Sequence, residues 1–356
     1  MRIKRILIIN NGLSGGGIER ASVSLAHYFI GLGYNVNIVA LYKGEHFFVL
    51  DDRIEFNEPD FSRESINKFL YLIKMILFLR MNVTRMKPDV ILAFSEWTNP
   101  FVVLATLGLQ VPLYLSDRMS PMAKLPLISS ILRKLLYKKA SGIIAQTEFA
   151  KEIIFKNTAA SNIQVIYNPV NCIQKSYCAV KNRIVSVGRL SKEKGHKNLV
   201  EAFASVTDKT WELSLVGDGT ERVNLELLAN RLGIGERVIF HGHLRDFTIQ
   251  LSEAKIFVLP SLSEGFPNAL IEAMSLPLAC ISSNCLAGPN EIIEDGVNGL
   301  LVEPGNINDL AVALNRLIEH PDLRENLAVN AYKVRETLSF EKIAHQYLDF
   351  IFDKNG

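Results

Sequence analysis

Arg5-Ile-Leu-Ile-Ile-Asn10 is a short apolar run, followed by glycines at 12, 15, 16 and 17 and by a helical pattern over Ile18–Leu32. A continuous apolar run of this length predicts a strand that is buried on both faces. A Gly-rich turn into a helix is the usual exit from such a strand in a parallel sheet. The segment therefore predicts one strand-turn-helix unit of an α/β protein.

The same rhythm continues for about half of the chain, because further apolar runs recur with mostly helix-length segments between them. Alternation of this kind specifies an α/β sheet with right-handed crossovers. The further strands predicted in the first half are Val36–Leu41, Val90–Phe94, Leu113–Ser116, Gly142–Gln146 and Gln164–Tyr167.

A polar stretch without clear period over 168–181 interrupts this rhythm, which then restarts. We therefore predict two Rossmann-like doubly wound domains facing a central cleft. The predicted boundaries are 1–170 for the first domain, 171–180 for the linker, 181–338 for the second domain and 339–356 for a final helix that could cross back to the first. The strands predicted in the second half are Arg183–Val187, Glu212–Val216, Val238–Phe240, Ile256–Leu259 and Leu278–Ile281.

Composition narrows the class of protein. The chain has 356 residues, enough for two domains of common size, with 48% hydrophobic residues and a mean hydropathy of +0.16. This hydropathy is high for a freely soluble protein and leaves contact with a membrane or apolar partner open. Residues 1–178 carry a net charge of +8 and the remainder −6, which indicates an anionic ligand or surface on the first half. No nucleic-acid motif accompanies the basic residues, so nucleic acid is not the expected partner.

The four cysteines lack metal-type spacing, and the chain opens without the pattern of a signal peptide. A cytoplasmic protein is the expectation. The longest apolar stretch, Phe69–Val83, is interrupted by Lys74 and Arg80, so no membrane-spanning segment is predicted.

The strongest candidate site is Pro260-Ser-Leu-Ser-Glu-Gly-Phe-Pro-Asn-Ala-Leu-Ile-Glu272, a loop that runs into a helix starting at Pro267. Glu264 lies in the loop and Glu272 in the helix, with Gly265 allowing close approach of a ligand. The amides of Phe266, Asn268 and Ala269 would face the cleft at the positive end of the helix dipole. One carboxylate can accept hydrogen bonds from sugar hydroxyls and the other from a ribose. An exposed loop acid and an ordinary helical Glu are the alternative.

The second candidate is Val187-Gly-Arg-Leu-Ser-Lys-Glu-Lys-Gly195, again directly after a predicted strand. Arg189 and Lys194 are cations on a Gly-bounded loop that could pair with a diphosphate. A leaving nucleotide diphosphate gains negative charge during glycosyl transfer, so fixed cations there act most in the transition state. The sequence offers no convincing acidic metal cage, so we expect no metal or other cofactor. A solvated basic turn is the alternative.

The third candidate, Ser14-Gly-Gly-Gly-Ile-Glu-Arg20, could bind phosphate through backbone amides at a helix start. Its spacing is not that of a dinucleotide site, and no acidic residue ends the strand near Leu41. A dehydrogenase is therefore disfavoured, and a plain tight turn stays an alternative.

Taken together, the loops resemble the retaining GT-B glycosyltransferases of glycosyltransferase family 4. That family is marked by a Gly-Gly-x-Glu opening loop, a G-R-x4-K phosphate clamp, a G-D/E-G turn and an E-x7-E element. The resemblance spans nearly the whole chain. The matching residues are Gly16-Gly17-Ile18-Glu19, Gly188-Arg189 with Lys194, Gly217-Asp218-Gly219, and Glu264 to Glu272.

The resemblance implies roles for these positions. Arg189 and Lys194 would hold the donor diphosphate, with Gly17 adding an amide. Glu264 would bind the transferred sugar and Glu272 the ribose. The implied donor site as a whole comprises Gly16, Gly17, Arg189, Lys194, Gly217, His243, Leu244, Glu264, Gly265, Phe266, Pro267, Asn268 and Glu272, with the backbone near His243-Leu244 at the base.

On the acceptor side the resemblance implies Glu19, Asp117 and Arg118. Many relatives place a histidine near the reactive carbon of the sugar, where this chain has Arg118 after Leu115-Ser-Asp117. Arginine cannot serve as a base at neutral pH. Arg118, which we count with Glu264, Arg189 and Lys194 as a catalytic candidate, could bind an anionic oxygen of acceptor or donor, or could pair with Asp117.

Residues 124–139 predict an amphipathic helix with Ile128, Ile131, Leu132, Leu135 and Leu136 on one face and Arg133, Lys134, Lys138 and Lys139 around it. Such a helix can lie on an anionic membrane surface, at the inner face of the plasma membrane. The alternative is a helix whose apolar face packs on the core.

The expected function is transfer of a hexosyl or N-acetylhexosaminyl group from a nucleotide-sugar, with UDP favoured, to a glycan acceptor carried on polyprenyl diphosphate. The resemblance implies a bacterial role in surface polysaccharide or glycoprotein glycan assembly. Two alternatives remain open at this point: a non-hydrolysing nucleotide-sugar epimerase of the same fold, and a non-catalytic two-lobed sugar-binding module.

Overall fold

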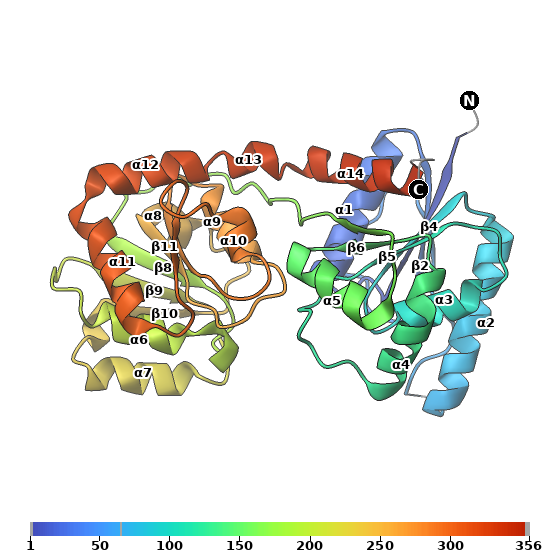
Figure 1. The fold of residues 1–356 in the computed structure, drawn as a ribbon, viewed down its shortest axis with the longest axis horizontal. Coiled ribbons are helices and arrows are strands. Elements are labelled where there is room, and N and C mark those ends of the chain that lie inside the picture. The colour runs from blue at the N-terminus through green and yellow to red at the C-terminus, as the bar shows by residue number, and fades with distance from the viewer. Residues whose placement is uncertain (1–2, 65, 353–356) are drawn as a thin grey trace. The chain divides into compact units, whose positions relative to one another are not determined.

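The computed structural model describes residues 3–64 and 66–352, which divide into two compact units. Unit 1 comprises the chain up to Tyr167 together with the segment from Ala344 onward, and unit 2 comprises Asn168–Ile343. Each unit is a parallel sheet with helices packed against it (Figure 1). The prediction of two Rossmann-like α/β domains is therefore confirmed.

The sheet of unit 1 has seven strands in the order β3-β2-β1-β4-β5-β6-β7, all paired in parallel. The strand order reverses between β1 and β4, which is the switch point where ligands of such sheets bind. The strands are β1 Arg5–Asn10, β2 Asn35–Ala40, β3 Glu55–Asn57, β4 Val90–Phe94, β5 Leu113–Ser116, β6 Gly142–Ala145 and β7 Ile163–Val165.

The helices of unit 1 cover this sheet and enclose a core that includes Leu7, Tyr71, Ile91 and Leu115. Within this layer α2 packs on α3, and α3 packs on α4. These helices are α1 Gly17–Gly31, α2 Lys68–Met86, α3 Asn99–Thr106, α4 Leu127–Leu136, a 3-10 turn Tyr137–Lys139, α5 Glu148–Thr158 and, from Ala344 onward, α14 Phe340–Phe352.

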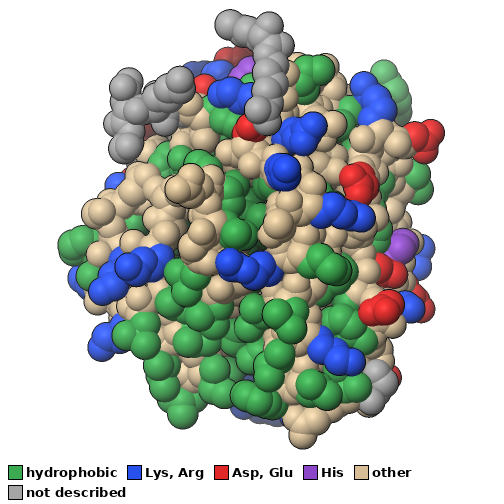
Figure 2. Space-filling model, turned by 90° about the vertical axis from the view of Figure 1, so that its right-hand side faces the viewer, with side chains coloured by type: hydrophobic (Ala, Val, Ile, Leu, Met, Phe, Trp, Pro, Cys, Tyr) green, Lys and Arg blue, Asp and Glu red, His purple; other side chains and the backbone are tan. Residues whose placement is uncertain are grey.

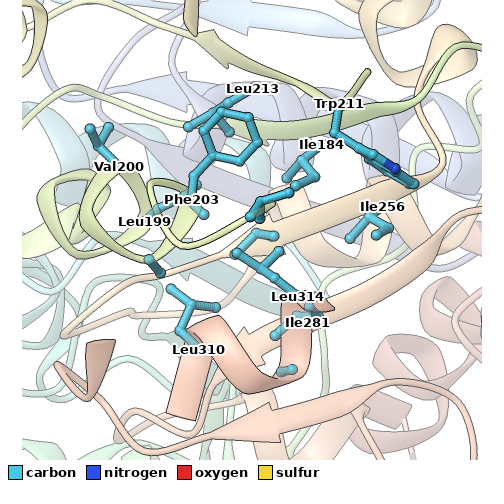
Figure 3. Packing of buried hydrophobic residues seen from close by; sticks show 14 of the residues in the cluster. Ile184, Leu199, Val200, Phe203, Trp211, Leu213, Ile256, Ile281, Leu310 and Leu314 are labelled. Carbon is cyan, nitrogen blue, oxygen red and sulfur yellow. The ribbon is translucent and has the colours of Figure 1, made fainter. Parts of the chain in front are cut away.

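The sheet of unit 2 has six parallel strands in the order β10-β9-β8-β11-β12-β13. Its core gathers Phe203, Trp211 and Leu314 around the strand residues Ile184 and Ile256 (Figure 3). The strands are β8 Arg183–Val187, β9 Glu212–Val216, β10 Val238–Gly242, β11 Ile256–Leu259, β12 Ala279–Ser283 and β13 Leu300–Val302. The helices are α6 His196–Phe203, α7 Arg222–Arg231, α8 Thr248–Glu253, α9 Asn268–Met274, α10 Pro289–Ile292, α11 Ile307–Glu319, α12 Pro321–Ala331 and α13 Val334–Thr337, with 3-10 turns at Lys192–Lys194 and Gly235–Arg237.

The segment predicted as a linker lies along the surface of unit 2. The Nδ2 of Asn171 donates to Glu272 at 3.2 Å, and the amide of Ile173 donates to the Ser275 hydroxyl at 3.3 Å. The amide of Ser176 likewise donates to the Ser252 hydroxyl. These bonds attach the segment to unit 2 although it has no regular secondary structure.

The last helix, α14, packs on the strands of unit 1. The ring of Tyr347 stacks near that of Phe94 at 6.4 Å, and Phe350 meets Tyr114 edge to face at 5.1 Å. A Cβ at Gly142 would collide with Phe350 at 2.6 Å, so glycine at this strand position lets the helix approach the sheet.

Two short strands, β3 and β13, were not predicted, because each has only three residues and β3 carries polar side chains at both ends. Within the described residues, no helix combines the length and the apolar character that crossing a membrane requires.

Candidate functional site

Three loops leave the carboxyl ends of neighbouring strands in unit 2 and are joined through their backbones. The amide of Gly188, after β8, donates to Val216 at the end of β9 at 2.9 Å, and the amide of Leu190 donates to Asp218 at 3.0 Å. The amide of Leu262, after β11, donates to Glu193 at 2.8 Å. Free helix starts and loop amides collect at this edge of a parallel sheet, so it is the expected place for a ligand.

Glycines allow these loops to approach so closely. Gly195 has φ 67° and Gly217 has φ 137°, both in the left-handed region. A Cβ at Gly195 would overlap the carbonyl oxygen of Pro260, and a Cβ at Gly217 would overlap that of Gly188. Two separate constraints, backbone angle and space, therefore require glycine at both positions.

Lys194 and Glu264, predicted from separate motifs, meet where these loops join. The Nζ of Lys194 lies 2.6 Å from Oε1 of Glu264, and the Ser261 hydroxyl donates to the same oxygen at 2.6 Å. The Glu264 side chain is 7% exposed, whereas that of Lys194 is 27% exposed. The carboxylate is therefore fixed by two donors, while the ammonium remains open to water and to a ligand.

Arg189 is exposed on the same loop, directly after β8. The pKa of Glu193 lies below its usual value, first because the Ser191 hydroxyl donates to it and further because Arg189 and Lys194 are nearby cations. The loop thus carries a positive field next to Glu264, as an anionic ligand group requires.

The second acid of the E-x7-E element lies on α9. Glu272 is half-buried, and one of its oxygens accepts from Asn171. The helix begins at Asn268, one residue later than predicted, and the amide of Asn268 donates to Phe266 at 2.9 Å. The prediction of an open amide at Asn268 is therefore wrong, because the tight turn around Pro267 uses it.

The predicted base-binding backbone follows β10 and lies beside the Gly217 turn. Gly217 donates its amide to the carbonyl of Gly242 at 2.9 Å. His243 is exposed and Leu244 is half-buried next to it. The structure therefore brings the loops after β8, β9, β10 and β11 to one edge of unit 2.

The Gly-rich turn of unit 1 opens helix α1, with Gly16 in the cap position and Gly17 as the first helical residue. Glu19 is buried, and its carboxylate folds back over Gly16, where a Cβ would overlap it. The side chain that the resemblance assigns to the acceptor therefore lies against its own helix start.

Asp117, after β5, is buried among three donors. It pairs with Arg133 at 2.5 Å through Oδ2, while Tyr137 and Asn99 donate to Oδ1 at 2.9 and 3.1 Å. The ion pair of Asp117 is thus made with α4. Arg118 donates to the Tyr347 hydroxyl at 3.0 Å and lies over the Phe94 ring.

Glu96, which sequence reasoning missed, adjoins this cluster. Its oxygen accepts from the amide of Met119, and the preceding Ser95 has φ 125°. Burial, and next the nearby charge of Asp117, raises the pKa of Glu96 to about 8. The sequence carried a signal for this residue, since Ser95-Glu96 directly follows the predicted strand Val90–Phe94, as the other site loops follow their strands.

Comparison with known proteins assigns the chain to a family. Residues 179–334 match the model for glycosyl transferases group 1, and residues 15–174 match the model for Glycosyltransferase Family 4. The chain belongs to glycosyltransferase family 4. Among the residues that the structure describes, this glycosyltransferase has no group of three or more His, Cys, Asp or Glu placed to hold a metal ion.

Relatives of this glycosyltransferase are bacterial enzymes. It is 26% identical over 356 residues, 98% of each chain, to the Campylobacter jejuni GalNAc-alpha-(1->4)-GalNAc-alpha-(1->3)-diNAcBac-PP-undecaprenol alpha-1,4-N-acetyl-D-galactosaminyltransferase. It is 25% identical over 362 residues to the amylovoran biosynthesis glycosyltransferase AmsD of Erwinia amylovora, covering 98% of this chain and 99% of AmsD.

Solved structures show the same two-domain fold. The lipopolysaccharide outer core galactosyltransferase WaaB, apo form, superposes with a TM-score of 0.81 at 25% identity, covering 98% of this chain and 99% of WaaB. Anabaena Alr3699/HepE in complex with UDP superposes with a TM-score of 0.82 at 21% identity, covering 97% and 98%. The GT-B fold expected from the motifs is thereby confirmed.

Proposed function

We propose that this glycosyltransferase transfers a hexosyl or N-acetylhexosaminyl group from a UDP-sugar to a glycan carried on polyprenyl diphosphate, with retention of anomeric configuration. The contact between Lys194 and Glu264, beside Arg189, carries the proposal. The donor preference is supported by HepE, which is solved with UDP. The acceptor class is supported by the undecaprenol-linked glycan in the name of the Campylobacter relative.

In this proposal Lys194 and Arg189 take the diphosphate, whose charge grows as the glycosyl bond breaks. In the ligand-free protein Lys194 is paired with Glu264. A bound diphosphate would share or replace that partner, leaving Glu264, still held by Ser261, to accept from sugar hydroxyls. Transfer needs no metal in this scheme because two side-chain cations neutralise the leaving group.

The other donor contacts follow the order of the loops. Glu272 accepts a hydrogen bond from the ribose and the backbone at His243-Leu244 meets the base. The family resemblance assigns an amide contact with the diphosphate to Gly17. On the acceptor side we assign an anionic oxygen to Arg118. The three donors around Asp117 favour a role in positioning the neighbouring Arg118.

The proposal is tested by screening nucleotide sugars for thermal stabilisation and for UDP release with a polyprenyl-diphosphate glycan. We expect UDP release that depends on the acceptor. Altered UDP-sugar without UDP release would instead indicate an epimerase. Absence of any response to every activated sugar, from protein that unfolds cooperatively, would contradict the donor site itself.

Glu264→Gln separates an enzyme from a sugar-binding module. The neutral amide accepts hydrogen bonds from sugar hydroxyls more weakly than a carboxylate does, and the change removes the ion pair with Lys194. We therefore expect kcat to fall by about 10²–10³. Glu291→Gln, on α10, serves as a control outside the loops. Unchanged turnover of Glu264→Gln would contradict the assigned role.

We also propose that α4 contacts an anionic membrane surface at the cytoplasmic face. Leu127, Ile128, Ile131 and Leu135 are each more than half exposed. These four side chains therefore stay outside the core, whereas Leu136 of the predicted apolar face packs on it. Arg133 is turned inward to Asp117, which leaves Lys134, Lys138 and Lys139 as the exposed cations. Lipid headgroups attract such a helix edge at about 1 kcal/mol per basic residue.

Changing Lys134, Lys138 and Lys139 together to Glu tests this contact by sedimentation with anionic liposomes. We expect binding to fall by more than about tenfold, since three attractive charges become repulsive. Undiminished sedimentation would refute the role of α4. Transfer to a water-soluble acceptor should be unaffected.

A further inference from the structure

Helix α2 has two apolar faces. Tyr71, Met75, Leu79 and Val83 are buried against the core of unit 1. On the other side, five large apolar side chains are between 40% and 72% exposed and follow one another at helical spacing. This second row, which we call the outer stripe, consists of Phe69, Leu70, Ile73, Leu77 and Met81.

An amphipathic helix on a globular protein normally presents polar residues to water, and a helix apolar on all sides is normally buried. The outer stripe extends from Phe69 to Met81, 13 residues of the helix, or about 18 Å. An exposed row of this length is more than the scattered single apolar residues found on any surface. The outer stripe therefore has the character of a surface that contacts an apolar partner.

We propose that the outer stripe of α2 inserts into the headgroup boundary of an anionic lipid bilayer. The surface is distinct from α4, although α3 packs against both helices. The side of the molecule on which α2 lies faces the viewer in Figure 2, where hydrophobic side chains gather in the lower half with Lys and Arg side chains around them.

Charge decides between a bilayer and a second copy of this chain. The sequence holds no Asp or Glu over residues 65–88, and none over 118–147. Lys68 and Lys74 are exposed on α2, whereas Arg85 is paired with Glu55. A symmetric dimer through this stripe would bring lysines of both copies together, while anionic headgroups complement them.

The mode of contact follows from the length of the helix and from its inner face. No described helix can span a bilayer, and the inner face of α2 is committed to the protein core. The stripe therefore lies in the plane of the interface, with the apolar side chains below the headgroups and the lysine ammonium groups among them.

The test is co-sedimentation of Leu77→Asp/Met81→Asp with vesicles of phosphatidylethanolamine and phosphatidylglycerol. These two side chains are 60% and 63% exposed, so the change leaves the core intact. We expect the vesicle partition coefficient to fall at least about tenfold, because two apolar side chains that the bilayer would bury become charged. Phosphatidylcholine vesicles should bind the unchanged protein more weakly than the anionic ones.

The matched control is Val223→Asp/Leu227→Asp on α7, where the side chains are 65% and 57% exposed at the same spacing. This control should bind vesicles as the unchanged protein does. Stabilisation by UDP, which reports on the donor site, should be equal in all three proteins, so failure of the membrane contact is distinguishable from failure of the proposed reaction.

Three results would overturn the inference. Vesicle binding of Leu77→Asp/Met81→Asp equal to that of the control would show that the stripe does not touch lipid, even where the α4 variant loses binding. A dimer of the unchanged protein that the double change converts to monomer would assign the stripe to a second copy. Absence of vesicle binding by the unchanged protein would remove both membrane contacts.

Discussion

Glu96 is a carboxylic acid that is buried in unit 1 beside a second acid, Asp117. Arg133 balances Asp117 directly, and the amide of Met119 donates to Glu96. Burial raises the pKa of Glu96 from 4.5 to about 8, so near neutral pH the group holds a proton. Arg133 then faces one carboxylate charge, that of Asp117. The amide of Met119, next to Arg118, donates to an uncharged acid.

This arrangement predicts a fall in stability with rising pH. Between about pH 4.5 and 8 the folded protein keeps a proton on Glu96 that the unfolded chain releases, so the free energy of unfolding decreases through that window. Glu96→Gln keeps the oxygen that accepts from Met119 but cannot ionise. The melting temperature of the variant relative to the unchanged protein should therefore rise between pH 6 and pH 9.

The control for this pH series is Glu319→Gln, an exposed acid near the end of α11. Its melting temperature should follow that of the unchanged protein at every pH. A difference between Glu96→Gln and the unchanged protein that is the same at pH 6 and pH 9 would show that Glu96 does not ionise over this range.

At the scale of elements, the site of unit 2 depends on how closely its loops approach. Gly195 and Gly233 have nearly equal angles, φ 67° and φ 69°. A Cβ at Gly195 would overlap the Pro260 carbonyl, whereas within 4 Å of a Cβ at Gly233 there are no atoms of the described chain outside its immediate neighbours. The pair separates the effect of backbone angle from that of space.

Gly233→Ala should lower the free energy of unfolding by about 1 kcal/mol, from the left-handed angle alone. Gly195→Ala should lose about 1–3 kcal/mol more, because the loop after β11 must move away. It should also weaken UDP binding, since Lys194 and Glu264 would separate. Urea unfolding and calorimetry with UDP measure the two effects, and equal losses for the two variants would contradict the close approach.

The sequence predicts the elements better than the contacts between them. β4, β5, β8, β9 and β11 lie where their apolar runs place them, because a strand buried on both faces has a continuous signal. The contact of Lys194 with Glu264 joins residues 70 positions apart, and the inward turn of Arg133 depends on packing. The outer stripe of α2 was hidden because periodicity does not tell which apolar face is covered.

At the scale of the whole molecule, each unit has its own core, which predicts two transitions in calorimetry. UDP at about 100 times its Kd should stabilise unit 2 by about 2.7 kcal/mol. Tyr347→Ala removes a buried ring of α14. It should lower the free energy of unfolding of unit 1 by about 3–5 kcal/mol and leave the transition of unit 2 unchanged. A single transition that both treatments move would show that the units unfold together.

Unit 1 is built from both ends of the chain, and unit 2 is one uninterrupted stretch between them. Exchange of this stretch, 168–343, for that of a relative would therefore replace unit 2 as one piece, with the second junction inside α14. A fragment that stops at Tyr167 would instead lose Phe350 and uncover the aromatic surface at Tyr114. Chimaeras of this glycosyltransferase need two junctions, and both termini should come from the same parent.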